Sequence, residues 1–90
     1  MFENLEHLIK TIRGRKKLSS DKSYTNKLLA DKNLSVSKVK EEISELIEAV
    51  EKNSNKIHEA ADVMYHLMVY LEANNVKIED VMAELENRKK

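Results

Sequence analysis

Apolar residues recur along the chain every three to four positions, in five segments separated by short polar stretches. This spacing is typical of amphipathic helices, and the absence of proline and the single glycine favour them further. Helices are expected at about residues 2–18, 24–31, 36–52, 56–73 and 78–88. The polar stretches SSDKS, NSN and NNVK are the breaks after the first, third and fourth of them.

Two serines are predicted to begin helices. Ser23 can cap the short second helix, since a serine hydroxyl satisfies free amide groups of a first helical turn. Ser35 is predicted as the N-cap of the third helix, because Leu34 before it and Val39 inside it are spaced for a hydrophobic staple.

The predicted fold class is all-α, a single domain over residues 1–90 that forms an antiparallel bundle of about five helices. A chain this short cannot enclose the wide apolar face of its fourth helix alone. We therefore expect a homodimer or a larger homo-oligomer to complete the bundle.

Charge and composition narrow the class of function. The chain has 16 basic and 16 acidic residues, so no net positive field would attract nucleic acid or a membrane surface. The basic stretch at residues 10–17 also lacks interleaved aromatic residues that could stack on bases. No cysteine, signal peptide or long apolar run is found, and a cytoplasmic protein is expected.

The two longest predicted helices each place a pair of acids beside an apolar face. On the third helix, Glu42 and Glu45 run along one margin of the apolar side chains. On the fourth, Glu59 and Asp62 interrupt the otherwise apolar stretch HEAADVMYHLMVYL, which has no Lys or Arg to neutralise them.

A short turn between these helices would form an antiparallel hairpin and bring the four carboxylates together. Four carboxylates that close would repel one another, so the cluster is favourable mainly around a cation. Oxygen ligands select hard ions, which indicates Mg²⁺, with Mn²⁺ as a substitute. A di-iron site would need Glu-x-x-His pairs, and the residues three before each histidine are Asn4, Asn55 and Val63.

Simpler interpretations apply to single residues. The acids of EEISE alone would be typical of a solvated helix face, and the pair on the apolar fourth helix makes the metal interpretation the stronger one. His66 is predicted to be a neutral, hydrogen-bonded histidine near the core, and Tyr65 to serve packing.

The motif EEISE, followed after thirteen residues by EAAD, resembles the acid signature of the all-α, MazG-type nucleotide pyrophosphohydrolases. Together with SYTNKLL, KVKEEISE and EAADVMYHLMVYL, it is similar to the phosphoribosyl-ATP pyrophosphohydrolases, which act in the second step of histidine biosynthesis. The resemblance runs from about Leu5 to Arg88. It implies Mg²⁺-dependent hydrolysis of the α–β phosphoanhydride of phosphoribosyl-ATP to phosphoribosyl-AMP and pyrophosphate.

The resemblance also implies roles for individual residues. Those matching metal-binding acids are Glu42, Glu45, Glu59 and Asp62, and those matching phosphate-binding basic positions are Arg15, Lys27 and Lys38. Glu41 matches the first acid of the motif, and either Glu41 or Glu45 is expected to act as general base on the attacking water. Lys40 and the ADKN stretch depart from glycine-containing positions of the family, which bears on substrate fit more than on chemistry.

Two other functions compete with this one. A MazG-type enzyme acting on other nucleoside triphosphates would share the metal site and differ in its base pocket. A non-enzymatic helical dimerisation module would leave the acids solvated, and its thermal stability would not respond to Mg²⁺.

Overall fold

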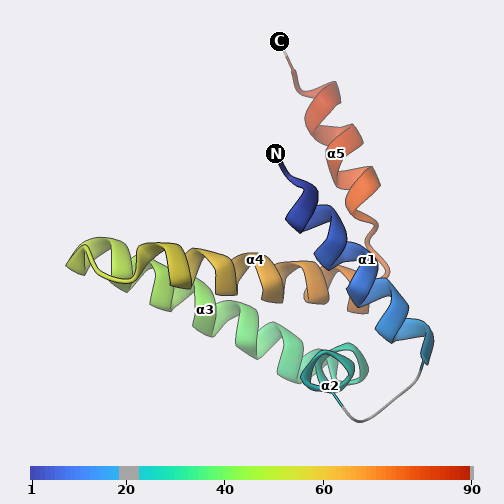
Figure 1. Cartoon of the computed structure of the whole chain (residues 1–90), viewed down its shortest axis with the longest axis horizontal. Helices are drawn as coiled ribbons and strands as arrows, with labels where there is room; N and C mark the ends of the chain where they lie inside the picture. The colour runs from blue at the N-terminus through green and yellow to red at the C-terminus, as the bar shows by residue number, and fades with distance from the viewer. Residues whose placement is uncertain (19–22, 90) are drawn as a thin grey trace.

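The computed structural model describes residues 1–18 and 23–89, and this part of the chain forms five helices and no strand. The helices, shown in Figure 1, are α1 (Glu3–Leu18), α2 (Tyr24–Ala30), α3 (Lys32–Lys52), α4 (Lys56–Ala73) and α5 (Ile78–Asn87). The predicted all-α class is confirmed. The predicted break at residues 19–23 lies outside the described residues, apart from Ser23.

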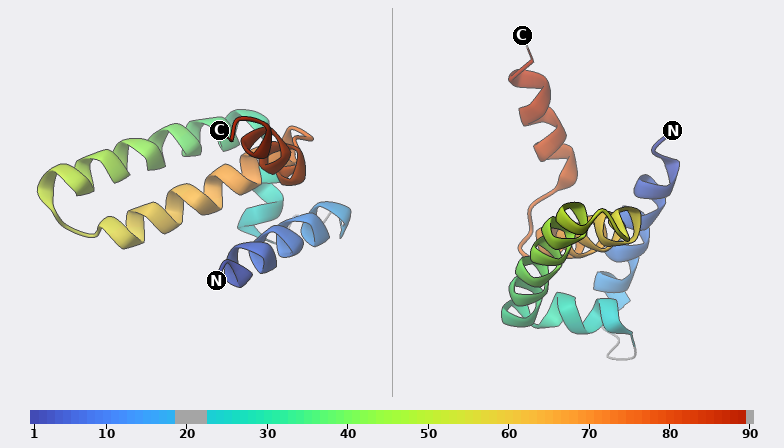
Figure 2. Two further views of the ribbon diagram at one scale, coloured as in Figure 1. Left: turned by 90° about the horizontal axis from the view of Figure 1, so that it is seen from above. Right: turned by 90° about the vertical axis from the view of Figure 1, so that its left-hand side faces the viewer.

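An antiparallel hairpin of α3 and α4 forms the long body of the molecule (Figures 1 and 2). The turn between them is short because Asn53 and Asn55 adopt the left-handed conformation, with φ of 54° and 56°. Asparagine tolerates this conformation better than most residues other than glycine. The backbone amide of Ser54 then donates to the Ala49 carbonyl at 3.0 Å and closes the end of α3.

The start of α3 differs from the prediction. Ser23 caps α2 as predicted, accepting from the Asn26 amide at 3.1 Å. The N-cap of α3, however, is Asp31, whose carboxylate accepts from the Leu34 amide at 3.0 Å. Ser35 is only 1% exposed and lies inside the helix, so its prediction as N-cap was wrong. Helix α3 therefore begins directly after α2, and Asp31 is both the C-cap of α2 and the N-cap of α3.

The core lies where α1 and α2 cross the end of α4. Four side chains form its buried centre: Ile12 of α1, Leu28 of α2, and Met68 and Val69 of α4. By contrast, α5 buries none of its residues, and α1 and α5 project to the same side of the hairpin (Figure 2). No helix within residues 1–18 and 23–89 is both long and apolar enough to cross a bilayer.

Ion pairs from the second half of α1 hold the corner between α4 and α5. The Arg13 guanidinium donates two hydrogen bonds to the Glu79 carboxylate, one of them at 2.7 Å, and approaches Glu72 at 3.4 Å. This contact lowers the pKa of Glu79 to about 2 and raises the pKa of Arg13. Lys16 donates to the Glu72 carbonyl and to the Asn75 side chain, each at 2.7 Å. Part of the basic stretch at residues 10–17 thus serves the fold.

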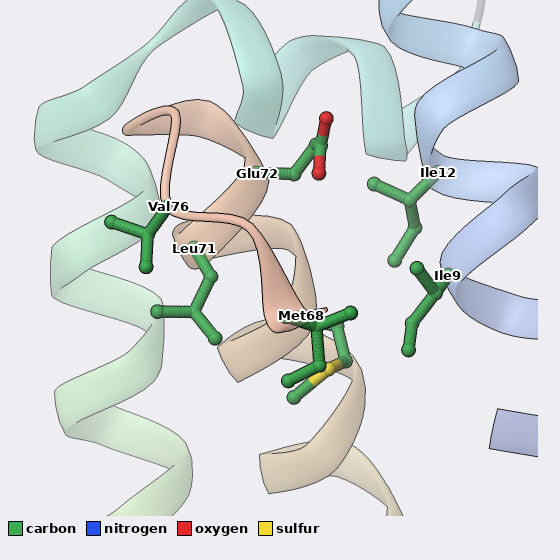
Figure 3. Close-up of a pocket in the computed structure, with 7 residues that line it drawn as sticks. Ile9, Ile12, Met68, Leu71, Glu72 and Val76 are labelled. Carbon is green, nitrogen blue, oxygen red and sulfur yellow. The ribbon is translucent and has the colours of Figure 1, made fainter. Parts of the chain in front are cut away.

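Two hollows lie at the same corner. Figure 3 shows the smaller one, a cavity of about 10 Å³ between Ile9 and Ile12 of α1 and Met68 and Leu71 of α4. It has room for about one water molecule. The larger one is a groove of about 870 Å³ formed by α1, α4 and α5. The residues that line these two hollows do not include the predicted metal-binding acids Glu42, Glu45, Glu59 and Asp62.

Candidate active site

The hairpin brings together acids from its two helices. One carboxylate oxygen each from Glu42 and Glu45 of α3 and Glu59 of α4 lie within 4.8 Å of one another. Asp62 belongs to an adjoining group, in which ligand atoms of His58, Glu59 and Asp62 also lie within 4.8 Å of one another. Glu59 is common to both groups, so the four predicted acids form one continuous acidic surface, called here the acid cluster.

Two oxygens of the acid cluster are buried without a hydrogen-bond donor. These are Oε2 of Glu42 and Oε2 of Glu59, which have no partner among residues 1–18 and 23–89. A buried carboxylate oxygen is ordinarily hydrogen-bonded, because leaving it unpaired costs the free energy of its lost hydration. Such oxygens, facing a third carboxylate, are suited to bind a cation.

The pKa values of the two glutamates reflect the same arrangement. Burial raises the pKa of the Glu42 carboxyl, and the negative charge of Glu45 adds to the rise. Loss of hydration also raises the pKa of Glu59, again with Glu45 as the main neighbouring cause. Both causes penalise the ionised form, and a bound cation would relieve both. The oxygen-only donor set of Glu42, Glu45 and Glu59 fits a hard divalent ion such as Mg²⁺.

His58 is a neighbour of the site that the sequence did not single out. Its Nε2 lies 3.4 Å from an Asp62 oxygen, one helical turn away. The i, i+4 spacing of His58 and Asp62 was a signal that could have indicated this contact.

His66 lies behind the acids and is only 7% exposed. Its Nδ1 is 2.9 Å from the Asp62 carbonyl oxygen and its Nε2 is 3.1 Å from the Tyr24 hydroxyl. This agrees with the prediction of a hydrogen-bonded histidine near the core. Tyr65, predicted to serve packing, also forms a hydrogen bond between its hydroxyl and that of Thr25.

The predicted phosphate-binding residues lie on three different helices. Lys38 of α3 is 3.1 Å from the Glu41 carboxylate, and this contact raises the pKa of Lys38. Lys27 is exposed on α2. Arg15 is exposed on α1, and its backbone carbonyl accepts a 2.8 Å hydrogen bond from Asn26 of α2. The structure thus links Lys38 to the acidic motif and connects the helices that hold Arg15 and Lys27.

Comparison with known proteins assigns the chain to a family. A family model described as phosphoribosyl-ATP pyrophosphohydrolase matches residues 5–89. A phosphoribosyl-ATP pyrophosphatase of Halobacterium salinarum is 37% identical over 95 residues, which cover 99% of this chain and 100% of the relative. Another, from Cereibacter sphaeroides, is 42% identical over 87 residues, covering 93% of this chain and 84% of the relative. A third, from Allorhizobium ampelinum, is 43% identical over 77 residues, with coverage of 82% and 74%. The chain therefore belongs to the phosphoribosyl-ATP pyrophosphohydrolase family, whose members are enzymes that hydrolyse a pyrophosphate bond.

Proposed function

We propose that this enzyme hydrolyses the α–β phosphoanhydride of phosphoribosyl-ATP in the second step of histidine biosynthesis, with Mg²⁺ as the physiological ion and Mn²⁺ as a substitute. The products are phosphoribosyl-AMP and pyrophosphate. The observation that carries the proposal is the acid cluster, in which two buried oxygens have no hydrogen-bond partner among residues 1–18 and 23–89. The chain that holds this cluster matches the family over residues 5–89.

Each part of the site has a role in this reaction. Glu42, Glu45, Glu59 and Asp62 would hold the cation, which stabilises negative charge developing on the leaving pyrophosphate. Arg15, Lys27 and Lys38 would bind substrate phosphates that the metal does not reach.

Two carboxylates are candidates for the general base that orients and deprotonates the attacking water. Glu45 lies within the acid cluster. Glu41 lies on the same helix and pairs with Lys38, outside both metal-ligand groups. A base needs a carboxylate that the cation does not fully engage, so the two proposals predict different effects on metal affinity.

The substrate is tested by measuring pyrophosphate release with Mg²⁺ from phosphoribosyl-ATP, ATP, dUTP and dCTP. We expect phosphoribosyl-ATP to have the highest kcat/KM. Preferential turnover of dUTP or dCTP would contradict the proposal and favour a MazG-type enzyme for other triphosphates. No turnover of any of them, with a melting temperature unaffected by millimolar Mg²⁺, would favour a non-enzymatic helical dimerisation module.

Removing the exposed ammonium group in Lys27→Ala should raise the KM for phosphoribosyl-ATP about tenfold, since one charge-assisted hydrogen bond to a phosphate is lost. The fold should be unaffected because the side chain is exposed. Steady-state kinetics measure the effect. Lys52→Ala is the matched control, because Lys52 is an exposed lysine that pairs with Glu48 at 2.5 Å. Equal kinetics for the two variants would show that Lys27 is a solvated surface residue that does not bind the substrate.

We also propose that the enzyme is a homodimer in which a second copy covers the groove between α1, α4 and α5. Several apolar side chains at the groove are well exposed in the single chain, including Phe2, Met64 and Met82. A ten-residue helix such as α5, with no buried residue, would be marginal in water by itself. Glu6 and Lys10 line the same groove, so a two-fold axis can place each beside its opposite charge on the other copy.

A charge placed in the groove should dissociate this dimer. Met64→Lys should shift the protein from dimer to monomer at micromolar concentration in analytical ultracentrifugation, because a buried ammonium without a partner is strongly unfavourable. Thr11→Lys, on the exposed side of α1 outside the groove lining, is the control and should remain dimeric. A parent protein that sediments as a folded, active monomer would contradict the proposal.

A further inference from the structure

Three successive residues at the start of α2 fasten this helix to its neighbours. The Tyr24 hydroxyl contacts Nε2 of His66, and the Thr25 hydroxyl contacts the Tyr65 hydroxyl, so adjacent residues of α2 bond to adjacent residues of α4. Asn26 donates to the Arg15 carbonyl of α1. Leu28 of the same short helix is buried in the core, and these side-chain contacts add specific hydrogen bonds to that packing.

The bond between Tyr24 and His66 has a defined direction. The Asp62 carbonyl can only accept a hydrogen bond, so the proton of the neutral His66 ring lies on Nδ1. Nε2 is then an acceptor, and the Tyr24 hydroxyl donates to it over 3.1 Å. The rings of Tyr24 and Tyr65 each meet His66 edge to face, with interplanar angles of 76° and 86°. The imidazole is held at both nitrogens and at both aromatic contacts.

This arrangement connects the two halves of the active site. His66 is on the same helix as Glu59 and Asp62 and bonds to the Asp62 backbone, whereas Tyr24 is one helical turn before Lys27 on α2. The helix that holds a predicted phosphate-binding lysine is therefore attached directly to the helix that holds half of the acid cluster.

We propose that Tyr24 is a positioning residue, which acts through His66 to hold Lys27 at a fixed place relative to the acid cluster. This inference rests on the proposed function. Tyr24 needs no contact with the substrate in this role. Its hydroxyl restricts the motion of α2, so that Lys27 and the acids engage the same polyphosphate without a further loss of conformational entropy on binding.

The experiment is a double-mutant cycle with Tyr24→Phe, Lys27→Ala and the combined variant, measured in the full chain. Tyr24→Phe should raise the KM for phosphoribosyl-ATP about threefold to tenfold, as expected for one lost hydrogen bond, with kcat little changed. In the Lys27→Ala background the same change should have almost no further effect, because the residue through which Tyr24 acts is gone. Tyr70→Phe is the control, since the Tyr70 hydroxyl takes no part in the three contacts that attach α2 to α1 and α4.

Binding readouts separate this inference from the proposed function. Mn²⁺ affinity, measured with the metal alone, should be the same in Tyr24→Phe as in the parent, while affinity for inorganic tripolyphosphate with Mg²⁺ should fall. An unchanged KM and tripolyphosphate affinity, additive effects in the cycle, or a loss of Mn²⁺ affinity would each overturn the inference. If the parent did not hydrolyse phosphoribosyl-ATP, the proposed function would fail, and the tripolyphosphate cycle would still decide the role of Tyr24.

Discussion

Glu45→Gln should reduce Mg²⁺-dependent pyrophosphate release by at least about a hundredfold, the loss expected when a metal ligand is replaced. Glu45 lies beside both Glu42 and Glu59, and its negative charge adds to the rise that loss of hydration causes in their pKa values. An amide at this position keeps the shape of the side chain but removes its negative charge and one of its two ligand oxygens. Turnover of phosphoribosyl-ATP over a range of Mg²⁺ concentrations measures the effect.

Glu48→Gln is the matched control for this prediction. Glu48 lies on the same helix, is exposed and pairs with Lys52, so its replacement should leave turnover unchanged. Glu41→Gln completes the set: a large loss of kcat with normal Mn²⁺ affinity would identify Glu41 as the base. If Glu45→Gln kept full activity and full Mn²⁺ affinity, the acid cluster would have no metal-binding role.

Glu42→Gln should have opposite effects on activity and on stability. Turnover should fall about a hundredfold, again through loss of a metal ligand. In EDTA, however, the variant should melt a few degrees higher than the parent. It removes a charge beside Glu45 whose buried Oε2 has no hydrogen-bond partner in the described part of the chain. Thermal melts in EDTA and in Mg²⁺, followed by circular dichroism, measure both effects.

The pH dependence of this stability difference follows from the raised pKa of Glu42. A carboxyl with a higher pKa in the folded state binds more protons there than in the unfolded state, so it destabilises the fold as the pH rises. In EDTA the advantage of the variant should therefore be largest at neutral pH and shrink as the pH falls and the parent carboxyl becomes protonated. A variant that melted well below the parent in EDTA would show that Glu42 is a structural hydrogen-bonding residue.

The sequence was sufficient to predict the hairpin and the acids on it. The boundaries of the fourth helix and the end of the third were correct, because long amphipathic segments flanked by asparagines have a strong periodic signal. Glu42, Glu45 and Glu59 could be expected to meet because a three-residue connection allows only an antiparallel arrangement.

Other features depended on contacts between distant residues. Arg13 and Arg15 look alike in the sequence, yet Arg13 binds Glu72 and Glu79, which are about sixty residues away.

Local signals also competed at the start of α3, where Asp31 and Ser35 are both acceptable caps. Asp31 is the cap in the structure, so α3 has one more turn than predicted and Ser35 lies buried within it.

Asp31 also determines how the enzyme can tolerate changes in length. Its backbone amide ends α2 on the Lys27 carbonyl at 3.0 Å, and its carboxylate starts α3, so no spare residue separates the two helices. An inserted residue here would turn or displace the helix bearing Lys27 relative to the helix bearing Glu42. The exposed turn at residues 53–55, in contrast, joins α3 to α4 at the opposite end of α3 and can lengthen with little effect on either. Evolutionary insertions and engineered tags are therefore compatible with the hairpin turn and incompatible with the α2–α3 junction.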